Sequence, residues 1–94
     1  MITSITNLDD VKLFARLLVK EGSNFHPDDD FLEYENYKTK LPYYTNEVAV
    51  LRNKLMDQCF AVCEEFGVDI YSTMGDEFLK ETGLDQVIPL STAA

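Results

Sequence analysis

Residues 45–67 read T-N-E-V-A-V-L-R-N-K-L-M-D-Q-C-F-A-V-C-E-E-F-G, the most regular helical pattern in the chain. Thr45 is a favourable N-cap, Glu47 lies in the first turn, where a carboxylate suits the helix dipole, and Gly67 stands where a helix would stop. Between them, apolar residues recur three or four positions apart and predict a helix over residues 46–66. These residues are Val48, Leu51, Leu55, Cys59, Val62 and Phe66. We expect this helix to be the central element of the fold.

The two cysteines lie on the apolar side of the same helix. Cys59 and Cys63 are one helical turn apart, and Met56 and Phe60 widen the apolar side around them. The redox motif C-x-x-C is absent, and a zinc site would need two further ligands in a chain with one histidine. We therefore expect both cysteines to act as small buried hydrophobes.

A first helix is predicted over residues 8–21. Asn7 is its N-cap, and Gly22 supplies the stop. Its main apolar stripe consists of Leu8, Val11, Phe14, Ala15 and Leu18.

Leu13 and Leu17 fall outside that stripe, and Lys12, Arg16 and Lys20 follow the remaining side. Either another part of the chain or a second copy must cover the two leucines. The sequence leaves this choice open.

A third helix is predicted over residues 70–81, with Asp69 as N-cap and Gly83 near its end. Gly75 lies toward its apolar side, which indicates either the close approach of a neighbour or a local break. Beyond it, residues 84–90 are expected to fold back as a turn or an extended cover, and residues 91–94 to fray.

The sequence therefore predicts an all-α fold, a compact array of three main helices in a single domain spanning residues 1–94. Residues 24–45 connect the first two helices and are too long to lack structure of their own. Asp30 and Glu33 have capping-box spacing, which predicts a short helix over residues 31–37. The aromatic side chains expected on the core are Phe25, Phe31, Tyr34 and one of Tyr43 or Tyr44, with Glu33 or Glu35 meeting Arg16 or Lys20.

Charge restricts the classes of partner. The net charge is −9 in 94 residues, and no basic cluster offsets it, which disfavours binding to nucleic acid and to anionic lipid. No apolar run approaches the roughly 20 residues of a membrane span, and the N-terminal residues do not resemble a signal peptide. We expect a cytoplasmic protein without a membrane partner, for which a basic protein is a suitable ligand.

His26, Asp28, Asp29 and Asp30 supply ligand types that suit a divalent metal ion, so His26, Asp28 and Asp30 are the metal-ligand candidates. The calcium-loop pattern, however, alternates its acidic positions, whereas these aspartates are consecutive and their side chains diverge. Metal binding is therefore an alternative to the main interpretation, which assigns the aspartates to the start of the short helix.

The sequence lacks a glycine-rich phosphate loop and the G-x-S-x-G and H-E-x-x-H motifs. We expect no enzyme and no cofactor. Another alternative is an acidic DNA mimic that inhibits a nucleic-acid enzyme, but interspersed lysines and arginines count against it.

The tyrosine-rich segment is the main functional prediction. Four tyrosines in so short a stretch cannot all be core, and a half-exposed tyrosine suits protein recognition. Acidic neighbours would steer a basic partner. We predict a protein-interaction module that binds another protein or a second copy of itself. The candidate partner-binding residues are Tyr34, Tyr37, Tyr43, Tyr44, Glu33 and Glu35.

Several motifs also resemble those of small uncharacterised bacterial helical proteins. They are N-F-H-P-D-D-D-F (24–31), Tyr44-Thr45, L-R-N-K-L-M (51–56), C-F-A-V-C-E (59–64) and G-V-D-I-Y (67–71), and the likeness spans residues 5–80. The resemblance implies a shared all-helical fold and no particular activity.

Overall fold

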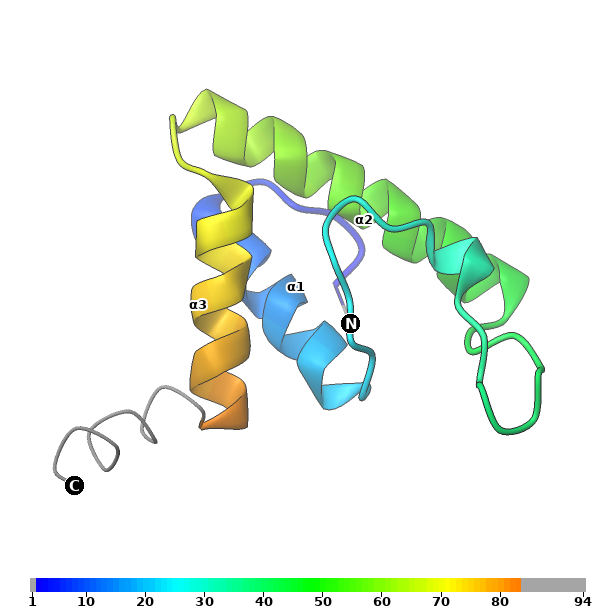
Figure 1. Cartoon of the computed structure of the whole chain (residues 1–94). Helices are drawn as coiled ribbons and strands as arrows, with labels where there is room; N and C mark the ends of the chain where they lie inside the picture. Colours follow the sequence, from blue (N-terminus) through cyan, green and yellow to red (C-terminus); the bar gives the residue numbers. More distant parts are fainter. Residues whose placement is uncertain (1, 84–94) are drawn as a thin grey trace, which may run out of the picture.

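The computed structural model describes residues 2–83 and contains three α-helices and one 3-10 turn (Figure 1). The helices are α1 (Leu8–Lys20), α2 (Asn46–Glu65) and α3 (Ile70–Thr82), and the turn is η1 (Phe31–Glu33). The all-α prediction is confirmed, and each helix ends within one residue of the predicted position. Glu21 and Phe66, predicted as the last residues of the first two helices, are their C-caps.

Each predicted N-cap satisfies a backbone donor of its helix. The side chains of Asn7, Thr45 and Asp69 accept hydrogen bonds from the amides of Asp10, Val48 and Ser72. These bonds join residues three apart, so the sequence alone is enough to specify where each helix begins.

The helices pack with α3 against α1, and α2 crosses the end of this pair (Figure 1). Most contacts of α3 are with α1, whereas α2 contacts α1, α3 and η1, so it is the element that the others share, as the sequence predicted. All three helices and η1 contribute to one core. Its fully buried large side chains include Phe14, Leu18, Phe31, Leu55 and Met74, together with both cysteines.

The buried side of α2 is rotated from its predicted position. Ala49 and Arg52 are buried, whereas Phe66 is 52% exposed. The cause is tertiary, because η1 and the connecting segment pack on the N-terminal half of α2 and cover that side. Helical periodicity alone predicted a stripe without an arginine in it.

The short helix predicted over residues 31–37 is only the turn η1, and it ends at Glu33. Tyr34 is already extended, and its carbonyl accepts the Tyr43 amide at 2.9 Å. The amide of Asn36 donates to the carbonyl of Leu41, also at 2.9 Å, and the Asn36 side chain accepts from the next turn of backbone. Residues 34–43 therefore form a hydrogen-bonded loop, because local pairing across Asn36 replaces the helical ladder.

Of the two leucines of α1 that lie outside its predicted apolar stripe, one packs against the core and the other is exposed. Leu17 packs against the core, but Leu13 is 47% exposed among the described residues. The expected pairing of Arg16 with Glu33 or Glu35 is wrong, because Arg16 bonds the buried Glu77 of α3 at 2.9 Å. This ion pair joins α1 to α3.

Gly75 neither breaks α3 nor accommodates a close neighbour. A Cβ atom built at this position would meet no atom within 4 Å. The predictions for residues 84–90 and 91–94 lie outside the described residues. Among residues 2–83, no helix has both the length and the apolar character needed to cross a membrane.

Candidate functional site

The segment that connects α1 to α2 is fixed to α2 by the side chain of Asn53. Its carbonyl oxygen accepts the Phe31 amide at 2.9 Å, and its amide nitrogen donates to the Asp30 carboxylate at 2.8 Å. The same carboxylate caps η1 by accepting the Leu32 amide. Asp30 and Asn53 therefore set the position of η1 and of the buried Phe31 ring.

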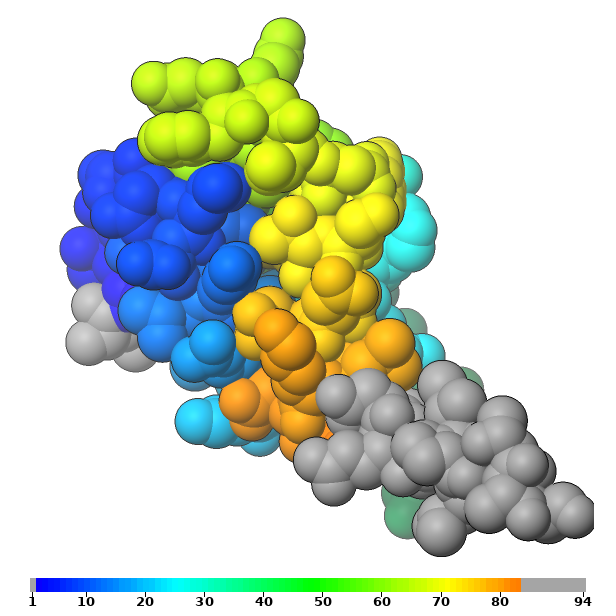
Figure 2. Space-filling view, turned by 90° about the vertical axis from the view of Figure 1, so that its left-hand side faces the viewer, coloured from blue at the N-terminus to red at the C-terminus, as the bar shows by residue number. Residues whose placement is uncertain are grey.

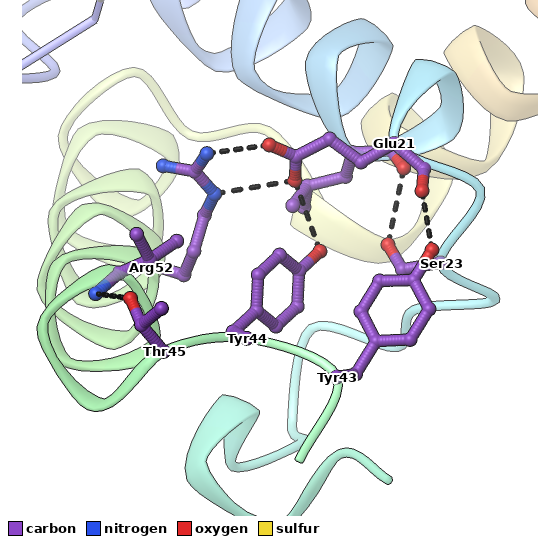
Figure 3. A network of polar contacts seen from close by, with 8 residues as sticks. Glu21, Ser23, Tyr43, Tyr44, Thr45 and Arg52 are labelled. Carbon is purple, nitrogen blue, oxygen red and sulfur yellow. Dashed lines mark hydrogen bonds and ion pairs between the residues drawn. The ribbon is translucent and has the colours of Figure 1, made fainter. Parts of the chain in front are cut away.

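A second attachment joins the end of α1 to α2 (Figure 3). Arg52 is 3% exposed and donates from Nε and Nη2 to the carboxylate of Glu21. The Tyr44 hydroxyl donates to that carboxylate at 2.9 Å, and the Tyr43 hydroxyl donates to the Glu21 carbonyl. In this network Glu21 is the common acceptor for one cation and two phenols.

These contacts divide the four candidate tyrosines into two pairs. Tyr34 and Tyr44 lie on the core with Phe31, as predicted, and burial raises the pKa of Tyr44 to about 12. Burial, followed by its hydrogen bond to Asp29, raises the pKa of Tyr34 as well. Both phenols remain neutral donors at physiological pH, and their hydroxyl groups are committed to structural bonds.

Tyr37 faces outward, whereas Tyr43 is only partly exposed because its hydroxyl bonds the Glu21 carbonyl. Tyr37 is 77% exposed and Leu41 is 64% exposed, and Leu32 and Tyr43 are exposed beside them. A hollow of about 400 Å³ lies next to them, between Leu32, Tyr43 and the start of α2. We call Leu32, Tyr37, Leu41 and Tyr43 the loop face. It projects from the helices at the N-terminal end of α2 (Figure 1).

The loop has a defined shape and a local positive charge. Lys40 has φ 62°, a left-handed conformation that is uncommon outside glycine, and its amide donates to the Asn36 carbonyl at 2.7 Å. Residues 36–43 include Lys38 and Lys40 and no acidic residue, although the whole chain carries −9. Glu33 and Glu35, both exposed, lie just before this basic stretch.

A separate groove of about 500 Å³ runs between α3 and residues 24–27, which lie side by side in Figure 2. Its walls are aromatic: the Phe25 and Phe78 rings are 6.4 Å apart, and the His26 and Tyr71 rings are 5.7 Å apart. Gly75 is part of its lining. We call it the α3 groove.

An acidic hollow of about 400 Å³ shares Pro27 with the α3 groove. The aspartates along both are Asp28, Asp29, Asp30, Asp57 and Asp76, and neither lining contains a lysine or an arginine. The two hollows are therefore neighbours: the α3 groove has the aromatic walls, and the acidic hollow has most of the negative charge.

The metal-ligand candidates are engaged in other contacts. The Tyr71 hydroxyl donates to Asp28 at 2.8 Å, and His26 Nδ1 accepts the Asp28 amide at 3.2 Å. Asp30 is bound by Asn53. No three histidine, cysteine or carboxylate side chains among residues 2–83 are grouped as metal ligands.

The site residues that sequence reasoning missed are Leu32, Leu41, Arg52 and Asn53. Leu32 and Leu41 lie in the same tyrosine-rich segment, but the prediction selected only its tyrosines and glutamates. No pattern in the sequence pairs Arg52 with Glu21 or Asn53 with Asp30, because each pair is separated by more than twenty residues.

Comparison of the chain with protein-family models, with curated proteins and with solved structures found no match. The likeness to small bacterial helical proteins therefore stays a prediction.

Proposed function

We propose that this protein is a small cytoplasmic protein-interaction module that binds its partner through the loop face. The observation that carries the proposal is the exposure of Tyr37 and Leu41 on a loop held in one shape by backbone hydrogen bonds. Large apolar side chains gathered on an ordered projection are typical of binding surfaces. A pre-shaped loop also loses little conformational entropy when it binds.

The structure changes which of the candidate residues support this function. Tyr37 and Tyr43 remain in the proposed contact, with Glu33 and Glu35 at its edge. Tyr34 and Tyr44 would support it indirectly, since their hydroxyl groups hold the segment to Asp29 and Glu21. Lys38 and Lys40 make the loop itself basic, so a partner for this face should present apolar and acidic groups together.

The test compares two double variants of the full chain. Tyr37→Ala/Leu41→Ala removes the two most exposed apolar side chains of the loop face. Leu13→Ala/Phe66→Ala is the matched control, because it removes exposed apolar side chains from α1 and from the C-cap of α2. Self-association is measured by sedimentation, and a foreign partner is sought by affinity capture from the cell of origin.

The proposal predicts that binding is lost in Tyr37→Ala/Leu41→Ala and retained in the control, with both variants folded by circular dichroism. Equal binding by wild type and Tyr37→Ala/Leu41→Ala would overturn it.

A further inference from the structure

The loop face and the α3 groove have complementary chemistry. The tip of the loop reads Y-K-T-K-L over residues 37–41 and presents two exposed apolar side chains with two lysines between them. The α3 groove offers aromatic walls and Asp76, and the acidic hollow that shares Pro27 with it adds four aspartates, with no lysine or arginine in either lining. An apolar and basic segment is the kind of ligand that such a groove accommodates.

One copy of the chain cannot bring these two surfaces together. The loop lies at the far end of α2 from α3 (Figure 1), and its backbone is closed by hydrogen bonds from Asn36 and Tyr43. Before the loop, Asn53 holds Phe31 against α2, and after it Tyr44 bonds the Glu21 carboxylate that Arg52 also holds. The surfaces can therefore meet only between two molecules.

We propose that the α3 groove receives the Tyr37–Leu41 loop of a second copy of this chain. This inference rests on the proposed function and names the partner of the loop face. Tyr37 or Leu41 would enter between Phe25, Tyr71 and Phe78, and Lys38 and Lys40 would lie against the aspartates.

Such a contact is heterologous, because it joins different surfaces of the two molecules. After one contact the pair still has one free loop and one free groove, each on a different copy, so association continues into a chain unless the geometry closes a ring. The small area of one loop predicts weak, concentration-dependent binding.

The charge of the groove favours this occupant over the chain's own residues 84–94. That segment reads L-D-Q-V-I-P-L-S-T-A-A and contains one aspartate and no basic residue. Its sequence offers apolar side chains but no cation to neutralise the aspartates. The Y-K-T-K-L loop supplies both.

The experiment reverses charge on one surface at a time in the full chain. Lys38→Glu/Lys40→Glu alters the loop, and Asp57→Lys/Asp76→Lys alters the groove. The four side chains form no hydrogen bond or ion pair within residues 2–83. Glu64→Lys/Glu65→Lys is the control for the groove variant, because it changes the net charge equally at the exposed end of α2.

Sedimentation should show wild-type association that weakens with salt, and each reversal alone should weaken it by about tenfold. The control should associate at least as well as wild type. Mixing the loop variant with the groove variant should restore association, since the native loop of the groove variant then meets the native groove of the loop variant.

Three results would overturn the inference. The first is a groove variant that associates as well as the control. The second is a wild-type protein that is monomeric at high concentration. If that monomer captures a foreign protein through Tyr37 and Leu41, the proposed function stands, and only the assignment of a second copy as the partner is wrong. The third is association that appears only after residues 84–94 are deleted, which would make that segment the occupant of the groove.

Discussion

The guanidinium of Arg52, almost completely buried in α2, is held by the carboxylate of Glu21, the residue that ends α1 (Figure 3). The pair joins the two helices on either side of the tyrosine-rich segment, and the Tyr44 hydroxyl completes it. Arg52 Nη1 has no hydrogen-bond partner within residues 2–83. The positive charge of Arg52 is therefore compensated mainly by the carboxylate of Glu21.

Glu21→Gln should destabilise the protein by about 3 kcal/mol, because it leaves a buried cation without its counter-charge. The double variant Glu21→Gln/Arg52→Met should recover most of that loss, since it removes the cation and keeps an oxygen for Tyr44. Urea unfolding of the wild type, the single variants and the double variant measures the coupling. A cost below about 1 kcal/mol for Glu21→Gln would show that the pair contributes little.

Asn53→Ala should loosen the segment locally as well as destabilise it. The substitution leaves the Phe31 amide without its acceptor and should cost about 1–2 kcal/mol. Amide hydrogen exchange should accelerate at Phe31 and Leu32 more than in the middle of α3. Lys54→Ala is the neighbouring exposed control, and equal effects of the two substitutions would contradict the role of Asn53.

Lys40→Gly should stabilise the protein by about 0.5–1 kcal/mol. Glycine removes the left-handed strain at φ 62°, and this gain exceeds its greater entropy in the unfolded chain. Lys38→Gly makes the same chemical change at a position with negative φ and should be neutral or destabilising. Thermal melting of both variants measures the difference, and equal shifts in melting temperature would contradict the strain at Lys40.

Cys59 and Cys63 should react slowly with thiol reagents in the native protein. Both are buried, and burial raises the pKa of the Cys59 thiol to about 12 and also raises the pKa of Cys63. Labelling at pH 8 should follow global unfolding, so a destabilised variant such as Glu21→Gln should label faster. Rapid labelling of the wild type would show that the thiols are accessible.

The raised pKa of the buried thiols makes the free energy of unfolding depend on pH in the alkaline range. The unfolded chain releases the thiol proton near its ordinary pKa of about 8.5, whereas the folded chain retains it. Stability should therefore fall as the pH rises from about 8.5 toward 12, and Cys59→Ala should remove part of that dependence. Urea midpoints between pH 7 and 10 measure it.

Local chemistry accounts for what the sequence by itself could determine. Asn7, Thr45 and Asp69 cap helices through bonds to amides three residues away, and Gly22 adopts the left-handed stop with φ 78°. Such signals lie within one helical turn, so the three helices, their ends and the inward position of Phe31 were predictable.

Contacts between distant residues account for the rest. Asn53 with Asp30 and Arg52 with Glu21 join residues more than twenty positions apart, and the short range of sequence patterns cannot select such pairs. They bury an arginine that lies outside the predicted apolar stripe, turn Tyr34 and Tyr44 inward, and leave Tyr37 and Leu41 exposed. The sequence therefore identified the segment that carries the proposed function. Its folding against α2 and α3 determined which of its side chains face a partner.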